Sequence, residues 1–278
     1  MKKKILAVIV ATALIVLCFT SCDNNASSDS QASQVTSSTT SSSDSTSSGT
    51  DTSSDTSDST SDSDKQLTAD DMFSDRDLSG DYSECTDITL SKSTASCSDS
   101  SVTVADSSVI ITKAGTYKLS GTFTGQIIVN AGDSDKVQLV LDNVSITKEG
   151  SAALYVANAD KVFVATVSGT ENTLASTGEF ATNDDEKNID GAIFSKSDIT
   201  FNGSGTLSVK CESKHGIVTK DDLKITGGTY NITSASQGFS GKDSVRIAGG
   251  NITVTSGTDG IHSENTDNTE KGYVYISG

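Results

Sequence analysis

Acidic and basic side chains that recur at a nearly fixed spacing are the groups in this chain that could do chemistry. Three aspartates fall near equivalent points of a repeating pattern, and three lysines recur in parallel with them. If the repeats stack about 4.8 Å apart, the carboxylates become close neighbours and repel one another. A calcium ion bridging them would remove that cost, and direct lysine–aspartate pairing is the alternative. The two columns are Asp198, Asp222 and Asp243, and Lys196, Lys220 and Lys242.

Two further groups of acids widen the set of candidate calcium ligands. One is the run Asp184-Asp185-Glu186 with nearby Asp190, and the other is Asp259 with Glu264 and Asp267. Neither group has the spacing of an EF-hand loop. The predicted metal ligands are Asp184, Asp185, Asp190, Asp198, Asp222, Asp243 and Asp259.

The same residues favour a binding protein over an enzyme. His215 and His262 have no recognisable serine or cysteine partner, so no catalytic triad is indicated. The lysines could act as bases in a lyase, but their regular repetition is typical of a structural column. We expect Lys196, Lys220, Lys242 and the aromatic ring of Tyr230 to contact carbohydrate, whereas Phe194 and Phe239 are expected to fill the core.

A repeat of about 22 residues predicts the fold. The segments that begin at Ala192, Gly216, Gly238 and Gly260 are separated by 24, 22 and 22 residues, and each continues into short alternating runs. Such a period indicates a stacked solenoid of the parallel β-helix kind rather than a sandwich, with about three strands per coil. Gly227-Gly228 and Gly249-Gly250 would turn the corners.

The N-terminal quarter predicts export and anchoring. Residues 1–22 combine three lysines, an apolar run and a terminal Cys22, which resembles a lipoprotein signal with Cys22 as the acylated residue. Residues 23–66 are rich in Ser, Thr and Asp and predict a disordered tether. We therefore expect a lipid-anchored monomer on the extracellular face of a bacterial membrane, with residues 67–278 as its folded domain.

Three local features complete the prediction for the folded domain. A short helix capped by Thr68 should place Met72 and Phe73 against a core end, and residues 176–188 should form a loop outside the stack. The sequence stops in the middle of a rung, which we interpret as truncation of a longer solenoid. The cysteines Cys85, Cys97 and Cys211 could include a disulfide pair, but we favour small buried hydrophobic groups.

Composition excludes one class of partner. The formal net charge is -17, so bulk charge does not favour binding to nucleic acid. Only 5% of the residues are aromatic, and there is no tryptophan or proline. Such a chain suits short stacked strands with aliphatic interiors.

Several segments resemble a bacterial family called carbohydrate-binding domain-containing proteins, over roughly residues 68 to 278. The resemblance implies a right-handed parallel β-helix of the pectate-lyase type, calcium bound at loops along the coils, and binding of cellulosic and pectic cell-wall polysaccharides. A calcium-dependent lyase and a surface adhesin with a protein partner are the alternatives. The chain departs from the family where His215 and Gln237 precede glycine in place of an acid, and at Ala157. The matching segments are Thr116–Gly121, Gly125–Val129, Asp135–Leu141, Tyr155–Val162, Gly169–Leu174 and Lys220–Gly228.

Overall fold

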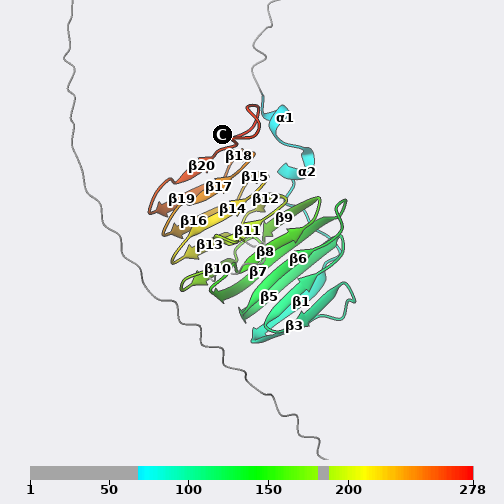
Figure 1. Cartoon of the computed structure of the whole chain (residues 1–278). Helices are drawn as coiled ribbons and strands as arrows, with labels where there is room; N and C mark the ends of the chain where they lie inside the picture. The colour runs from blue at the N-terminus through cyan, green and yellow to red at the C-terminus, as the bar shows by residue number, and fades with distance from the viewer. Residues whose placement is uncertain (1–67, 181–187, 278) are drawn as a thin grey trace, which may run out of the picture. The chain divides into compact units, whose positions relative to one another are not determined.

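The computed structural model describes residues 68–180 and 188–277, which belong to one compact unit, Asp62–Gly278. Strands dominate this part of the chain and stack along one direction (Figure 1). The predicted signal, the acylation site Cys22, the tether, and the candidate ligands Asp184 and Asp185 lie outside the described residues. Within the described part, no helix is long and apolar enough to cross a membrane.

The strands of the described part form two sheets, one of 13 strands and one of eight. We call the larger sheet A and the smaller sheet B. The strands of sheet B are β3 (Val102–Ala105), β4 (Ser108–Ile111), β6 (Gln126–Asn130), β8 (Leu154–Asn158), β11 (Gly191–Ser195), β14 (His215–Thr219), β17 (Phe239–Gly241) and β20 (Ile261–Ser263). Those of sheet A are β1 (Thr86–Lys92), β2 (Thr94–Ser96), β5 (Gly115–Thr124), β7 (Lys136–Glu149), β9 (Lys161–Thr166), β10 (Glu171–Thr177), β12 (Asp198–Gly203), β13 (Thr206–Cys211), β15 (Asp222–Ile225), β16 (Thr229–Ser234), β18 (Ser244–Ile247), β19 (Asn251–Ser256) and β21 (Tyr273–Ile276).

The repeat seen in the sequence is the stacking period of the structure. Each coil from β8 to β19 contributes one strand to sheet B and two to sheet A, as in β14, β15 and β16, which are followed by β17, β18 and β19. Ile217 of β14 pairs in parallel with Phe239 of β17, and Phe239 pairs with Ile261 of β20. These partners are 22 residues apart, so the prediction that equivalent repeat positions stack is confirmed.

Sheet A curls because its early strands bend at a bulge. The pairing of β5 with β7 shifts register between Ser120 and Gly121, where Asn143 of β7 has a positive φ of 55°. In the later coils the chain instead breaks into two strands, and Gly228 turns one corner with a φ of 97°. Glycine suits this position because a side chain makes that backbone conformation costly. The corner predicted at Gly227-Gly228 is confirmed.

The core lies in the interior enclosed by the two sheets. Alternate residues of each strand point inward, as in β16, where Tyr230 and Ile232 are buried and their neighbours face outward. Phe239 belongs to this interior cluster, as predicted. Cys211 is also buried there, and Cys85, Cys97 and Cys211 are all free thiols, so no disulfide links them.

A short N-terminal segment runs over the outer surface of sheet A (Figure 1). We call residues 68–81 the strap. It contains two single-turn helices, α1 (Ala69–Met72) and α2 (Asp75–Leu78), and Ser74 and Asp77 form a capping box at the start of α2. Met72 and Phe73 are buried, but against Tyr273 and Tyr275 on the outside of the coils rather than at a core end, because α2 holds the strap flat on the sheet.

Candidate functional site

The outer face of sheet B carries a continuous row of side chains that are neighbours across successive strands. The strand alternation that sends Ile127, Leu154 and Ile193 inward sends the next residue of each strand outward. Adjacent members of the row lie on paired strands, so the row follows the stacking direction. Its members are Ile110, Ile128, Tyr155, Phe194, Val218, Ser240 and His262.

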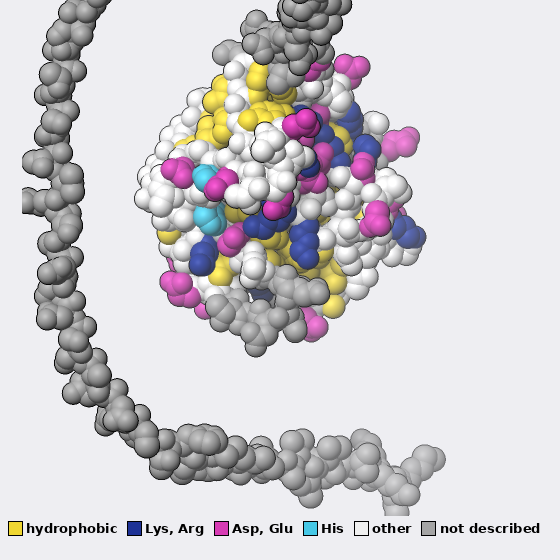
Figure 2. Space-filling view, turned by 45° about the horizontal axis from the view of Figure 1, so that its top comes forward, with side chains coloured by type: hydrophobic (Ala, Val, Ile, Leu, Met, Phe, Trp, Pro, Cys, Tyr) yellow, Lys and Arg dark blue, Asp and Glu magenta, His cyan; other side chains and the backbone are white. Residues whose placement is uncertain are grey.

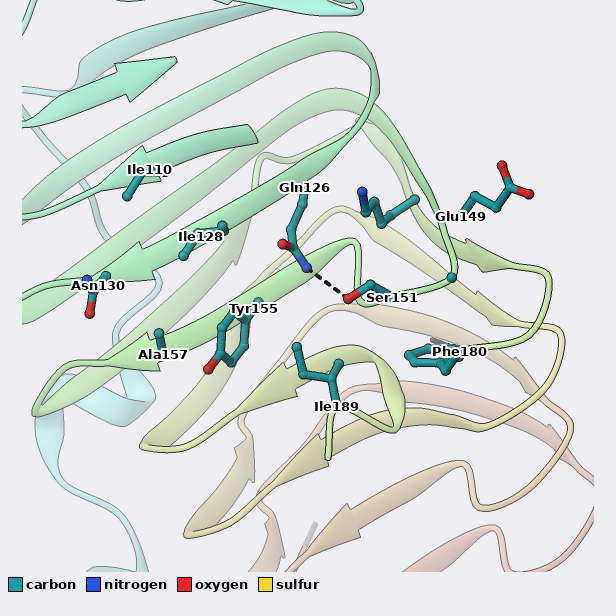
Figure 3. A pocket seen from close by; sticks show the side chains of 12 residues that line it. Ile110, Gln126, Ile128, Asn130, Glu149, Ser151, Tyr155, Ala157, Phe180 and Ile189 are labelled. Carbon is teal, nitrogen blue, oxygen red and sulfur yellow. Dashed lines mark hydrogen bonds between the residues drawn. The ribbon is translucent and has the colours of Figure 1, made fainter. Parts of the chain in front are cut away.

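A pocket of about 660 Å³ opens at one end of this row, over β4, β6 and β8. Figure 3 shows Ile128 and Tyr155 on its floor, with the amide of Gln126 directed toward the hydroxyl of Ser151. The Gln126 side chain donates hydrogen bonds to Ser151 Oγ at 3.3 Å and to the Ala152 carbonyl at 2.8 Å. An apolar floor with fixed polar groups at its edge is typical of a site for a small organic group such as a sugar ring.

The two described ends of the 176–188 loop reach this pocket. Phe180 and Ile189 both line it, and Ile189 packs against the cluster that contains Tyr155 and Phe194. The residues that flank this insertion therefore lie on the outer face of sheet B, and that it borders a binding surface stays a prediction.

The predicted lysine column borders the same face. Ser195, Thr219 and Gly241 pair across β11, β14 and β17, so the lysines that follow them occupy equivalent positions. Lys220 and Lys242 line a second hollow of about 320 Å³ over β14, β17 and β20. The ammonium of Lys220 lies 5.2 Å from the centre of the Phe194 ring and 3.8 Å from the Asp190 carboxylate. These contacts fix the lysine over the aromatic part of the row.

His215 lies beside this column in its neutral form. Its Nδ1 accepts a hydrogen bond of 3.2 Å from the backbone N–H of Gln237. Burial lowers the pKa of His215, and the acceptor role of Nδ1 is incompatible with a proton on that nitrogen. The neutral ring therefore keeps its remaining N–H as a donor. Nearby Asp190 has one carboxylate oxygen, Oδ1, that is buried without a hydrogen-bond partner in the described structure.

One residue predicted to contact carbohydrate does not lie on this face. Tyr230 is fully buried in the interior of the coils, where its ring meets Phe201 edge-on at 6.1 Å. It points inward because its position in β16 is an inward one, so it cannot offer its ring to a ligand. Phe194 is buried in a hydrophobic cluster, as expected, but this second cluster lies on the outer side of sheet B and is separate from the interior of the coils.

The predicted column of acids is real and lines a separate cavity. Asp198 stands beside Asp222 in the paired strands β12 and β15, and Asp243 stands one coil beyond Asp221. These four acids line one hollow of about 410 Å³, together with Arg246 and Lys271. On the face drawn in Figure 2, basic and acidic side chains interleave rather than forming separate patches.

Crowding perturbs the carboxyl groups of this cavity in opposite directions. Burial, a hydrogen bond with Asp243 and the nearby acids raise the pKa of Asp221 to about 7. Burial and the charge of Asp222 raise the pKa of Asp198. Burial also acts to raise the pKa of Asp243, but hydrogen bonds from Lys271 and Asp221 outweigh it and lower that pKa. The hydrogen bond between these two carboxyl groups thus favours the protonated form of Asp221 and the ionised form of Asp243.

The acidic side chains of this cavity are not arranged as a metal-binding site, because cations of the protein pair with two of them. Arg246 pairs with Asp222 at 2.9 Å, and Lys271 pairs with Asp243. No group of three or more His, Cys, Asp or Glu side chains within the described ranges is placed to hold a metal ion. Asp190 and Asp259 lie elsewhere, beside Lys220 and His262 respectively. Protein cations therefore neutralise part of the column, but they are Arg246 and Lys271 rather than the lysine column that the sequence offered as the alternative to calcium. Lys220 and Lys242 pair instead with Asp190 and Asp267.

Sequence reasoning missed the outer row of sheet B and the role of Asp221. The alternation of Ile127, Ile128 and Val129 shows that one isoleucine must face outward, but not that Tyr155 and Phe194 continue its row. Asp221 directly precedes the predicted Asp222, and only the pairing of the coils brings it to Asp243.

Comparison with known proteins identifies the family of this chain. A family model described as carbohydrate-binding domain-containing protein matches residues 105–278. The chain belongs to this family. The match spans the strands that build both the outer row of sheet B and the acidic cavity, from β4 to β21.

Two relatives add to the assignment. A carbohydrate-binding domain-containing protein of Acetivibrio thermocellus is 44% identical over 179 residues, which cover 64% of this chain and 63% of the relative. The chain thus spans less than two thirds of that relative's length. A solved structure, described as a polysaccharide lyase-like protein from C. thermocellum in a gadolinium derivative, matches with a TM-score of 0.67 and 38% identity. That match covers 70% of this chain and 80% of the solved one.

Proposed function

We propose that this protein binds polysaccharide along the outer face of sheet B. The observation that carries the proposal is the row from Ile128 through Tyr155 and Phe194, with a pocket at one end and a lysine-lined hollow at the other. A polymer repeats along its length, and so does a face built from stacked coils. Tyr155 and Phe194 are buried and support the face from beneath, so Ile110 and Ile128, which are partly exposed, would contact the faces of the sugar rings. The lysines would bind hydroxyl or carboxylate groups of the polymer.

Cell-wall polysaccharide of the cellulosic or pectic kind is the ligand that we propose. The lysine column favours chains with carboxylate groups, and the apolar row suits the flatter faces of neutral sugars. Anchoring to the outer face of a bacterial membrane through Cys22 belongs to the same proposal, because a surface lipoprotein meets such polymers directly.

A pull-down assay with insoluble cellulose and pectin tests the binding face. The double variant Lys220→Ala/Lys242→Ala should lower the affinity for pectin about tenfold, since each lysine contributes a charge-assisted contact. Lys210→Ala is the matched control, because Lys210 is exposed on β13, away from sheet B. Equal affinity of the double variant and the wild type would contradict the proposed face, and failure of the wild type to bind any glycan would favour an adhesin.

We propose a binding role rather than lyase activity. A lyase needs a free base beside the sugar ring, whereas Lys220 is held between Phe194 and Asp190. Incubation with pectate, followed by ultraviolet absorbance of unsaturated products, separates the two. Product formation that requires Lys220 would replace the binding proposal with the lyase.

The finer description of the fold is also a proposal: a right-handed parallel β-helix. It is supported by the order β14, β15, β16, β17, β18, β19, in which each strand pairs in parallel with the strand three places later. A crystal structure of residues 67–278 would test both the handedness and the closure of the coils.

Calcium remains part of the proposal. The raised pKa values of Asp198 and Asp221 mark carboxyl groups without sufficient counter-charge, which is the condition that a bound cation relieves. The ion pairs of Asp222 and Asp243 would have to rearrange for those two residues to become ligands.

A further inference from the structure

The strap lies on a surface of sheet A that donates hydrogen bonds to it. Side chains from three strands, and from Thr226 directly after β15, donate to four backbone carbonyl groups of the strap. The strap is therefore held through its backbone carbonyl groups, as a bound peptide would be, and it pairs with no strand of the described structure. The four contacts are Gln138 Nε2 to Asp81 O at 3.3 Å, Asn202 Nδ2 to Ser79 O at 2.9 Å, Thr226 Oγ1 to Asp77 O at 2.6 Å and Arg246 Nη1 to Met72 O at 3.2 Å.

One carboxylate of the strap enters a site built from three strands. Asp77 is completely buried, with Oδ1 at 2.5 Å from Lys161 Nζ and 2.8 Å from Thr200 Oγ1. Its Oδ2 lies 3.1 Å from Lys224 Nζ. Two cations and a hydroxyl thus surround a single carboxylate from below, and Ser74 of the strap completes its shell from above. The surface below Asp77 is a carboxylate-binding site.

The interior of the coils does not depend on the strap. Met72 and Phe73 are buried but do not belong to the hydrophobic cluster that fills the interior. Their partners are Tyr273 and Tyr275, whose side chains meet them on the outside of β21. A segment that contributes nothing to the interior can open as a unit while the coils stay folded.

The face beneath the strap also has the composition of a binding surface. Lys161 and Lys224 lie there in a chain whose net charge is -17, and Arg246 lies beside them in an ion pair with Asp222. The ring of Phe163 lies among them, 5.4 Å from the Lys161 ammonium and 4.8 Å from the Arg76 guanidinium of the strap. With the strap lifted, two lysines would lack their buried counter-charge, and the face would attract anions.

We propose that the strap is a removable latch, and that the face beneath it is a second binding site for polymers of carboxylate-bearing sugars. In the closed state Asp77 occupies the place of one such carboxylate. The identity of the ligand rests on the proposed function, whereas the opening of the latch does not. This site lies on sheet A and is separate from the sheet B face, so loss of one leaves the other intact.

Hydrogen exchange of the full chain tests the latch. Asp77→Asn should speed exchange in residues 72–81 at least about tenfold and leave β14–β16 protected, because only the strap loses its anchor. Asp75→Asn is the matched control, since Asp75 lies in the same helix, is exposed and carries the same charge. Unchanged exchange in the strap of Asp77→Asn overturns the proposal, as does simultaneous loss of protection in β14–β16.

Binding to soluble polygalacturonate tests the site, in a Lys220→Ala/Lys242→Ala background that removes the proposed sheet B contacts. In that background Asp77→Asn should raise the affinity for polygalacturonate at least about fivefold, whereas Asp75→Asn should leave it unchanged. Neither variant should change binding to neutral hydroxyethylcellulose. Adding Lys161→Met and Lys224→Met should abolish the gain. A loosened strap without any gain in polygalacturonate affinity overturns the second site. If the Lys220→Ala/Lys242→Ala change alone does not weaken binding, that result contradicts only the proposed function of the sheet B face.

A second variant covers the case in which Asp77→Asn does not fold. Phe73→Ala loosens the far end of the strap, where the ring of Phe73 lies 6.2 Å from that of Tyr275, and leaves both lysines in place. It should show faster exchange in residues 72–81 and a smaller gain in polygalacturonate affinity. Faster exchange without that gain again overturns the second site.

Discussion

Asp77 and Lys224 are 147 positions apart in the chain, and their charged groups form a buried ion pair at 3.1 Å. Lys161 approaches the other oxygen of the same carboxylate at 2.5 Å. Burial alone would raise the pKa of Asp77, but the hydrogen bonds from Lys161, Ser74 and Thr200 outweigh it and hold that pKa well below its usual range. The ionised carboxylate is therefore the form that ties the strap to sheet A.

Removing the charge of Asp77 should weaken the closure of the strap. In Asp77→Asn, Lys161 and Lys224 keep their buried charges without a counter-charge while the strap is closed, so we expect the free energy of opening the strap to fall by about 3 kcal/mol. Native-state hydrogen exchange of residues 72–81 measures this change, and the coils should keep their own stability. Asp75→Asn should stay within about 0.5 kcal/mol of the wild type, because Asp75 is exposed. Equal free energies of strap opening in the two variants would contradict the role of the pair.

The pH dependence of stability should reflect Asp221. Its pKa is raised from 3.8 to about 7 in the folded protein, so the folded state retains a proton that the unfolded state releases. Its contribution to stability is fully present below pH 3.8 and is lost as the pH rises through about 7.

Asp221→Asn should remove this dependence. The free energy of unfolding of the variant should exceed that of the wild type by on the order of 1 kcal/mol at pH 8 and by little at pH 4. This value is reduced because Asp221 is partly exposed to solvent. Melting temperatures from pH 4 to 8 measure the difference between the two proteins. A difference that does not vary with pH would show that Asp221 ionises normally. Asp259→Asn, at an acid remote from the cavity, is the control.

Residues of the sheet B pocket should contribute to glycan affinity. Ile128→Ala and Asn130→Ala each remove a side chain that lines the pocket and points away from the interior. We expect each to weaken polysaccharide binding about threefold to tenfold, or roughly 0.6–1.4 kcal/mol, as measured by affinity electrophoresis. Thr233→Ala, at an exposed position of β16, should bind as the wild type does. Unchanged affinity in both pocket variants would place the ligand elsewhere.

Calcium should stabilise the protein if it binds the acidic cavity. A bound ion shifts the melting temperature upward in proportion to its affinity for the folded state, so adding a chelator should lower the melting temperature by a few degrees. Asp198→Asn/Asp222→Asn should abolish the response, because those residues stand side by side in the cavity. A chelator that leaves the wild-type melting temperature unchanged would remove calcium from the proposal.

The sequence by itself determined the stacking of this protein. The period between Gly216, Gly238 and Gly260 predicts which residues lie on top of one another, because stacked coils repeat at equal chain length. The alternation within each short run predicts which side chains point inward in most strands. The prediction that Tyr230 contacts carbohydrate is wrong, because the alternation of its strand places the ring in the interior of the coils.

Only the tertiary structure decided what surrounds each charged group. The spacing of the aspartates predicts a column, but whether Asp222 meets a metal ion or Arg246 depends on side chains from a neighbouring coil. The sequence predicts a short helix capped by Thr68, whereas the capping box of Ser74 and Asp77, and the two lysines from β9 and β15 that meet Asp77, are seen only in the structure. Repetition along the chain sets local and stacking order, whereas contacts across large chain separations depend on how the strap closes over the assembled sheet.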